Sequence, residues 1–201
     1  MKPRPALLFA TTNPGKLREL RALAEGVEVL SPDEVPGLPT VEESEPTLAG
    51  NAARKALAWA RASGRVTLAD DSGLFVDALD GRPGVRSARY AAGHDAARVS
   101  RLLEEMRDVP DARRTAAFRC VLCLASPGGR SVTEEGELRG SVTREPRGTG
   151  GFGYDPVLLV PELGRTLAEL SLEEKGRLSH RARAFARMLP WLSAYRRGDW
   201  P

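Results

Sequence analysis

Residues 6–24, ALLFATTNPGKLRELRALA, contain the pattern that decides the fold. Residues 6–10 are uniformly apolar, as in a strand that is buried on both faces. A turn at residues 11–16 follows, and leucines then return at helical spacing, with Pro14 or Gly15 opening the helix. A buried strand that leads directly into a helix is typical of an α/β protein.

The rest of the chain continues this alternation. Further strands are expected at residues 27–30, 66–69, 114–126 and 131–143, and further helices at residues 47–63, 95–107 and 179–195. Strands separated by helices predict a parallel or mixed sheet, whereas the turn at residues 127–129 predicts an antiparallel hairpin in a second lobe. Ligands of such sheets collect where loops leave the carboxyl ends of strands. We therefore expect one domain over residues 1–201, with two lobes around an active-site cleft.

The composition indicates a chain that can bury a full core, since 41% of its 201 residues are hydrophobic. Its formal charge of +3 comes from 30 basic and 27 acidic residues without a long single-sign block, which does not favour a nucleic-acid partner. No apolar stretch approaches the length of a membrane span, and residues 1–10 lack the pattern of a signal peptide. We expect a cytoplasmic protein with neither a membrane nor a nucleic acid as partner.

Lysine and asparagine are scarce in this sequence, which has only four Lys beside 26 Arg and only two Asn. Such a composition should retain these residues mainly where Arg or Asp cannot replace them, because Lys is a compact point charge and Arg a planar fork. Three lysines, Lys16, Lys55 and Lys175, and both asparagines, Asn13 and Asn51, fall in segments with chemical character. These segments are the candidate site.

Cys120 and Cys123 form a C-x-x-C pair that we interpret as structural. They lie in an apolar run, residues 116–125, that is predicted as a strand, where a spacing of three places the side chains on opposite faces. A redox pair would need a helix start at this point, and a structural zinc ion would need two more ligands.

Residues 11–16, TTNPGK, connect the first strand to the first helix. Backbone N–H groups and the helix dipole at such a junction can bind an anion, and Lys16 adds a positive charge. The spacing of a Walker loop is missing, because Leu17 stands where the metal-binding hydroxyl should follow the lysine. By itself, the segment fits a capped helix with an incidental lysine equally well.

Asp70 and Asp71 are expected to end the strand at residues 66–69, with residues 74–76 continuing beyond Ser72 and Gly73. Carboxylates in this position lie where substrate loops gather, and they are ligands that Mg²⁺ prefers. Because adjacent strand residues point to opposite faces, only one of the two is expected to face a given pocket. An isolated D-D-S-G is otherwise typical of a turn in which Asp and Ser cap backbone groups.

Three acids, Glu42, Glu43 and Glu45, precede a helix in which Asn51 and Lys55 share a face. Acids in this position usually complement the helix dipole. Together with the lysine of the first turn, this segment also offers a metal ligand and a second cation for phosphate.

The loop at residues 148–155, GTGGFGYD, places Phe152 among glycines. Glycines allow close backbone approach, and the ring could stack on a base. The alternative is a hinge whose phenylalanine packs into the core. A third lysine, Lys175, precedes Ser179, His180 and Arg181 at the head of the last helix.

Together, these segments resemble the inosine triphosphate pyrophosphatase family, the Ham1-like enzymes that act on non-standard purine nucleotides. The resemblance runs from Leu8 to about Ala184 and covers nearly the whole chain. It rests on six pieces in the order typical of the family: FATTNPGKLREL (9–20), EE (42–43) before NAARKA (51–56), LADDSGLFVDAL (68–79), PGVRSARY (83–90), EPRGTGGFGYDP (145–156), and EEK (173–175) with LSHRARA (178–184). Each piece is ambiguous alone, but the six in this order are highly specific.

The resemblance implies a two-lobed α/β protein in which helices flank an elongated mixed β-sheet with a central cleft, the ITPase/Maf-like fold, usually as a homodimer. It implies Mg²⁺-dependent hydrolysis of a nucleoside triphosphate to the monophosphate and pyrophosphate. The substrates of such enzymes are ITP, dITP and XTP, so the activity would remove non-standard purine nucleotides from the precursor pool.

The resemblance also assigns roles to individual residues. Asp71 matches the family's proton acceptor, and Glu43 and Asp71 match its metal ligands. The substrate-binding positions of the family fall on Thr11, Thr12, Asn13, Pro14, Gly15, Lys16, Lys55, Ser72, Phe152, Gly153, Tyr154, Asp155, Lys175, His180 and Arg181. Of these, Thr11, Asn13, Lys16 and Lys55 would hold the phosphates, and the residues from Ser72 onward would line the nucleotide pocket.

The chain departs from the family pattern at three positions. Gly50 stands where an acid usually precedes the asparagine of the helix, which removes any metal-ligand role there. Thr12 replaces a common glycine, and Ala92 looks like an insertion, but both affect loop shape alone.

Two other functions remain as alternatives at the level of sequence. A pyrophosphatase of related fold that acts on modified pyrimidine or 7-methylguanine nucleotides would share the metal and phosphate chemistry. A nucleotide sensor or RNA-binding module without catalysis would be expected to carry a basic stripe with interleaved aromatics, which this sequence lacks.

Overall fold

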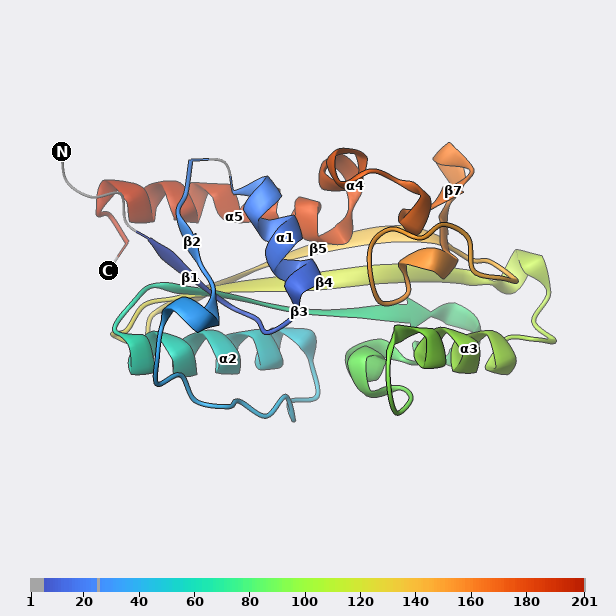
Figure 1. The fold of residues 1–201 in the computed structure, drawn as a ribbon, viewed down its shortest axis with the longest axis horizontal. Helices are drawn as coiled ribbons and strands as arrows, with labels where there is room; N and C mark the ends of the chain where they lie inside the picture. The colour runs from blue at the N-terminus through green and yellow to red at the C-terminus, as the bar shows by residue number, and fades with distance from the viewer. Residues whose placement is uncertain (1–5, 25, 201) are drawn as a thin grey trace. The chain divides into compact units, whose positions relative to one another are not determined.

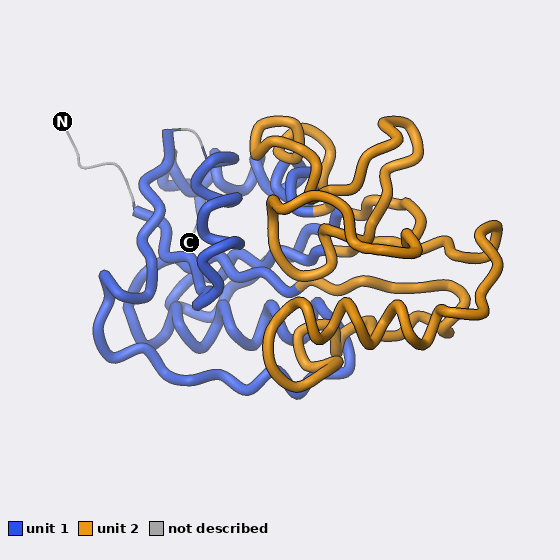
Figure 2. Tube along the Cα trace, turned by 45° about the vertical axis from the view of Figure 1, so that its right-hand side comes forward, with its two compact units in different colours: residues 1–71, 120–136, 181–201 blue, residues 72–119, 137–180 orange. Residues whose placement is uncertain are grey.

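The computed structural model describes residues 6–24 and 26–200, which form two compact units (Figure 2). Unit 1 draws on residues 1–71, 120–136 and 181–201, and unit 2 on residues 72–119 and 137–180. The strands and longer helices are β1 Leu7–Ala10, α1 Pro14–Leu23, β2 Val29–Leu30, α2 Leu48–Ser63, β3 Thr67–Val76, α3 Asp95–Glu105, β4 Thr115–Ala125, β5 Ser131–Val142, β6 Leu158–Val160, β7 Arg165–Thr166, α4 Leu172–Leu178 and α5 His180–Arg197.

Within the described residues, seven strands pair in the order β2-β1-β3-β4-β5-β6-β7. Strand β1 pairs in parallel with β2 and β3, and Leu8 lies opposite Thr67 in the second pair. Strand β6 pairs in antiparallel fashion with β5 and β7, and Leu159 lies opposite Thr166. The sheet is therefore mixed and open, as the sequence predicts for this α/β chain.

Unit 1 has helices on both faces of its strands. Figure 1 shows α1 and α5 on one face and α2 on the other. Apolar side chains of β1, β3 and β4 pack with those of α1 and α5 in one core, whose members include Leu7, Phe9, Leu20, Leu68, Leu122, Leu124, Phe185 and Met188. These strands are nearly continuous apolar runs because they are covered on both faces.

Unit 2 has a separate core. Its members come from the second half of β3, the first part of β4, strands β5 and β6, and helix α3, and include Leu74, Val76, Leu102, Met106, Phe118, Leu138, Val157 and Leu158. Arg114 is buried beside this core and donates hydrogen bonds to the carbonyl groups of Met106, Val142 and Thr143. Each unit therefore buries its own apolar side chains.

The structure corrects the sequence at β3, which is one strand of ten residues and does not end before Asp70. Asp70, Asp71, Ser72 and Gly73 therefore lie inside the strand, although D-D-S-G is typical of a turn. The pairing of β3 in the sheet overrides this local preference. The predicted strand at residues 27–30 is also shorter, since β2 contains Val29 and Leu30 alone.

Two smaller findings bear on function. Cys120 and Cys123 are buried thiols on β4, and burial raises the pKa of Cys123 to about 12, which keeps that thiol protonated. Over residues 6–24 and 26–200, no helix combines the length and apolar character needed to cross a membrane.

Candidate active site

The site begins where β1 turns into α1. Asn13 is the N-cap of α1, and its side-chain oxygen accepts hydrogen bonds from the backbone N–H groups of Gly15, at 2.8 Å, and Lys16, at 3.2 Å. Pro14 occupies the first helical position, where no N–H is needed. Thr11 in turn accepts from the N–H of Asn13 at 3.1 Å. These side chains fix the turn and the direction in which α1 leaves the sheet.

The N–H groups at the start of α1 are thus already hydrogen-bonded to Asn13 and Thr11. The sequence suggested them as direct phosphate ligands. In the structure, the cation of this turn is the side chain of Lys16, and the cap holds its backbone in place. A direct contact between phosphate and the N–H groups stays a prediction.

Asp70 forms the centre of a buried ionic network. The ammonium nitrogen of Lys16 lies 2.9 Å from Oδ1 of Asp70, and the guanidinium of Arg181 donates to Oδ2 from Nε at 3.2 Å and from Nη2 at 2.9 Å. Arg181 also pairs with Glu19 of α1. Burial raises the pKa of Asp70, but Lys16 and then Arg181 outweigh it and hold that pKa far below its usual range.

Asp71 has different partners, because its side chain and that of Asp70 point to opposite faces of β3. Its Oδ2 accepts a hydrogen bond from Nδ2 of Asn51 on α2 at 3.0 Å. Burial is the largest influence on the pKa of Asp71 and raises it; Lys16 opposes this effect, and the negative charge of Glu43 adds to it. The net result is a carboxylate whose pKa lies above the usual value.

Lys55 and Glu43 lie beside Asp71 and pair with each other. Nζ of Lys55 lies 2.6 Å from Oε1 of Glu43, and both side chains are partly buried. Burial lowers the pKa of Lys55, but the charges of Asp70 and Glu43 outweigh it, so the pKa is raised and the side chain stays cationic. Asn51 and Lys55 do share a face of α2, as their spacing predicts, and each donates to one of these two acids.

A magnesium ion fits this donor set. Glu43 and Asp71 offer hard carboxylate oxygens, and their mutual repulsion contributes to the raised pKa of Asp71, which a cation would relieve. The described residues contain no group of three or more His, Cys, Asp or Glu side chains placed to hold a metal alone. Two carboxylates are the usual protein share of a Mg²⁺ site that also uses substrate phosphates and water.

Unit 2 contains a second cluster, built around Asp155. Its Oδ2 accepts a hydrogen bond from the N–H of Phe152 at 2.8 Å and one from Nζ of Lys175 at 2.5 Å. The same ammonium lies 4.9 Å from the centre of the Phe152 ring. The N–H of Gly153 donates to Asp95 of α3 at 2.6 Å. The backbone N–H groups of Phe152 and Gly153 thus fasten the glycine-rich loop to two carboxylates.

Tyr154 and His180 are buried in unit 2. The hydroxyl of Tyr154 donates to the carbonyl of Ser87 at 3.0 Å, and its ring belongs to the unit 2 core. The ring of His180 stacks on Phe118 with centroids 4.7 Å apart and planes 12° from parallel. Both residues support the loop and the start of α5, and a direct contact with a base stays a prediction for each.

The structure therefore divides the predicted residues into two sets. Unit 1 brings together Thr11, Asn13, Lys16, Glu43, Lys55, Asp71 and Arg181, and unit 2 holds Ser72, Phe152, Gly153, Tyr154, Asp155, Lys175 and His180. Arg181 was predicted to line the nucleotide pocket. Its guanidinium is buried on Asp70 and Glu19 in unit 1, and a contact with the nucleotide stays a prediction. Thr12 and Pro14 lie exposed beside the first set.

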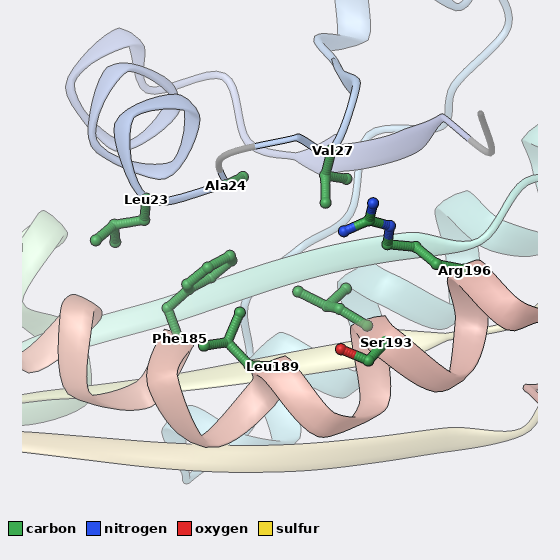
Figure 3. Close-up of a pocket in the computed structure, with 8 residues that line it drawn as sticks. Leu23, Ala24, Val27, Phe185, Leu189, Ser193 and Arg196 are labelled. Atoms are coloured by element: carbon green, nitrogen blue, oxygen red, sulfur yellow. The ribbon is translucent and has the colours of Figure 1, made fainter.

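Sequence reasoning did not place Glu19, Asp95 or Phe118 near the candidate site. The helical spacing of Glu19 predicted no role, and it is the long-range pair with Arg181 that shows one. A small cavity of about 40 Å³ between α1 and α5 is also unrelated to the ionic clusters, since it is lined mainly by apolar side chains such as Leu23, Phe185 and Leu189 (Figure 3). It is too small for a nucleotide.

The chain matches known proteins over almost its full length. The model of the Ham1 family matches residues 7–191. A protein of Geobacter sulfurreducens named dITP/XTP pyrophosphatase is 52% identical, over 90% of this chain and 92% of its own length. Another of that name, from Symbiobacterium thermophilum, is 48% identical over 94% of this chain and 95% of its own.

Solved structures give the same result for the fold. The HAM1 protein from Coxiella burnetii superposes with a TM-score of 0.84 at 37% identity, covering 94% of this chain and 98% of that protein. A nucleoside-triphosphatase named dITP/XTP pyrophosphatase, from Mycobacterium abscessus, gives a TM-score of 0.73 at 46% identity over 92% of this chain and 99% of its own. Both the sequence motifs and the α/β architecture thus lead to one assignment: this chain belongs to the Ham1 family.

Proposed function

We propose that this protein hydrolyses the non-standard purine nucleotides ITP, dITP and XTP to the monophosphate and pyrophosphate. Relatives that are 48% and 52% identical to it carry the name dITP/XTP pyrophosphatase. The observation that carries the proposal is the pair at the middle of β3. Asp70 contacts the Lys16 ammonium, and Asp71 lies among Asn51, Glu43 and Lys55.

The phosphate part of the substrate is assigned to unit 1. A bound triphosphate carries about four negative charges, which cationic side chains and a metal ion must offset. Lys16 and Lys55 supply two positive charges there, and Glu43 and Asp71 would hold the magnesium ion. Bound at these acids, Mg²⁺ supplies further positive charge for the phosphate oxygens.

Asp71 is assigned the role of proton acceptor. Its carboxylate can take a proton from water, and the hydrogen bond from Asn51 fixes its orientation. A water molecule that gives its proton to Asp71 attacks the α phosphorus. The bond from that phosphorus to the bridging oxygen breaks, and pyrophosphate leaves with the electron pair.

Recognition of the base is assigned to unit 2. Phe152 offers a ring for stacking, and the buried pair of Asp155 and Lys175 holds that ring and its backbone. A 6-oxo purine presents an acceptor where adenine presents an amino donor, so a donor such as Lys175 or a backbone N–H favours the former.

The decisive experiment measures products from ITP, ATP, GTP and UTP in the presence of Mg²⁺. We expect IMP and pyrophosphate from ITP, with a kcat/KM at least about tenfold above the other nucleotides. Loss of turnover in EDTA would support the metal assignment. Release of orthophosphate in place of pyrophosphate would contradict the cleavage site. Preference for UTP would favour a pyrophosphatase of modified pyrimidines, and no turnover of any nucleotide would favour a binding module.

The stacking role has a separate test. Phe152→Ala should raise KM for ITP, dITP and XTP together, because each base loses the same stacking partner, worth about 1–3 kcal/mol. Phe75→Leu is a control that replaces a partly buried aromatic ring of the same unit, one that lies under Arg119 and is not a candidate site residue. An unchanged KM in Phe152→Ala would show that the ring does not contribute to binding of the base.

A homodimer remains a prediction from the family resemblance, and a cytoplasmic location remains a prediction from the sequence. Light scattering on the purified protein across a concentration series decides the first: a mass of about 22 kDa would correspond to the monomer, whose chain has 21.7 kDa.

A further inference from the structure

The proposed chemistry uses the charge of Lys16 but gives no role to the buried side chains behind it. Four charged side chains form a chain of contacts in the order Glu19, Arg181, Asp70, Lys16. They come from α1, α5 and β3, which are distant in the sequence. We propose that Asp70 is a positioning residue that holds the ammonium of Lys16 in place for the phosphates, with Arg181 and Glu19 as its support. The inference rests on the phosphate assignment in the proposed function.

The four side chains of this chain of contacts differ in exposure. The side chain of Asp70 is 0% exposed, that of Arg181 1% and that of Glu19 6%, whereas that of Lys16 is 15% exposed. Among these four, Lys16 therefore reaches furthest toward solvent, where an anion can meet it. The other three lie behind it and can act on a substrate only through Lys16.

The charges of the four side chains cancel. Lys16 and Arg181 carry two positive charges, and Asp70 and Glu19 carry two negative charges. Burial of single charges is unfavourable, but a balanced and hydrogen-bonded set is tolerated. Removing Asp70 alone would leave an excess positive charge in the interior, while removing Asp70 and Lys16 together would restore the balance.

A positioning role follows from the chemistry of lysine. Its four-carbon stem is flexible, and its ammonium is a point charge without the fixed geometry of a guanidinium. Ordering such a side chain on phosphate binding is entropically unfavourable. In this structure the contact with Oδ1 of Asp70 orders Lys16 in advance, and Arg181 fixes that carboxylate by two hydrogen bonds to its other oxygen.

The test is a double-mutant cycle with Asp70→Asn, Lys16→Met and the double variant. Tripolyphosphate is the probe, and its binding is measured by calorimetry in EDTA, so that neither the base nor the metal contributes. Asp70→Asn should weaken binding about tenfold when Lys16 is present, and should change it little in the Lys16→Met background. Equal losses in both backgrounds, or no loss in Asp70→Asn, would overturn the proposal.

Thermal unfolding of the same variants separates positioning from folding. The double variant should be more stable than Asp70→Asn, because its buried charges balance again. Asp33→Asn, an exposed aspartate of unit 1, is the matched control and should leave both binding and stability unchanged. A double variant that is less stable than either single variant would contradict the charge balance on which the inference depends.

A measurement on the unmodified protein covers the case in which Asp70→Asn does not fold. The chain has only four lysines, so ¹³C-labelled lysine gives a simple NMR spectrum, in which Lys16→Arg identifies the Lys16 signal. The Cε methylene of Lys16 should be restricted before any phosphate is added. Free rotation there would overturn the proposal. Wild-type protein that binds tripolyphosphate through an ordered Lys16 but releases no pyrophosphate from ITP would instead defeat the proposed function alone.

Discussion

Asp70 and Asp71 are neighbours in the sequence with opposite electrostatic environments. Burial raises the pKa of each, but ion pairs with Lys16 and Arg181 bring that of Asp70 far below the usual range. Asp71 keeps a raised pKa, because burial and the negative charge of Glu43 outweigh Lys16 and the hydrogen bond from Asn51. The first residue is therefore suited to remain an anion, and the second to accept a proton.

The role of Asp71 can be tested by replacing it with asparagine. Asp71→Asn keeps an oxygen that can accept the hydrogen bond from Asn51, but it cannot take a proton from water. We expect kcat for ITP to fall at least about a hundredfold with a folded protein. Steady-state kinetics and circular dichroism check this, with Asp33→Asn as the matched control. Near-normal turnover in the folded variant would rule out the role of proton acceptor.

The same substitution makes a prediction about stability. A raised native pKa means that Asp71 favours folding below the pKa of an unfolded Asp, about 3.9, and loses that contribution as the pH rises through the native value. Ionised Asp71 is thus unfavourable at neutral pH, and the Asn variant avoids this cost. In EDTA, Asp71→Asn should melt at a higher temperature than the wild type at pH 7–8, with a gap that closes toward pH 4.

The difference in melting temperature between the wild type and Asp71→Asn isolates the effect of Asp71, because the other carboxyl groups titrate equally in both proteins. A wild type that is the more stable of the two at pH 8 would show that Asp71 is stabilised as an anion in the folded protein. If Asp71→Asn is instead the more stable protein, the carboxylate needed for activity lowers the stability of the fold.

The sequence predicts some residues of this region and not others, for a physical reason. The scarcity of lysine and asparagine pointed to Lys16, Lys55 and Asn51, and all three lie in the ionic clusters of unit 1. Glu19 could not be found in this way, because an acid in a helix usually faces solvent. Its partner Arg181 stands 162 residues later, and only the fold brings the two together.

At the scale of elements, the start of α1 determines where Lys16 lies. Asn13 accepts two backbone hydrogen bonds, and Thr11 fixes Asn13. This arrangement was partly predictable, since Asn before Pro-Gly is a typical helix start. The capped helix and the anion site were alternatives in the sequence, and the structure supports the cap directly.

Two substitutions of Asn13 separate the cap from the charge. Asn13→Ala removes the acceptor and should lower the free energy of unfolding by about 1 kcal/mol. Asn13→Asp keeps an acceptor and favours the helix dipole, so stability should be retained, but its negative charge beside Lys16 should raise KM for ITP. Denaturant unfolding and kinetics of both variants check this. An Asp variant with unchanged KM would place the phosphates away from this turn.

Other elements show where local patterns fail. The long helices α2, α3 and α5 and the β4-β5 hairpin were predicted within a few residues of their observed bounds. Strands β6 and β7 have three and two residues and helix α4 has seven, so each is too short for a periodic signal. The continuous strand β3 was missed because D-D-S-G resembles a turn, and only pairing in the sheet shows otherwise.

At the scale of the molecule, neither unit is a single stretch of sequence. The chain passes from one unit to the other after Asp71, Arg119, Gly136 and His180. Strand β3 contains the first of these crossings, so its first half belongs to the core of unit 1 and its second half to that of unit 2. Asp70 and Asp71 lie on the unit 1 side of this boundary, and Ser72 is the first residue of unit 2.

Because β3 contributes to the cores of both units, we expect the two units to unfold together. Leu68 and Leu74 are a matched pair, because both are fully buried leucines of β3 but belong to different cores. Leu68→Ala and Leu74→Ala should each lower the free energy of unfolding by about 2–5 kcal/mol, or the Tm by about 2–4 °C per kcal/mol. Because the strand is common to both units, either variant should shift one shared transition in calorimetry, with equal calorimetric and van't Hoff enthalpies. If Leu68→Ala moved one transition and left another in place, the units would fold independently, and the chemistry of Asp71 would then depend on the stability of unit 1 alone.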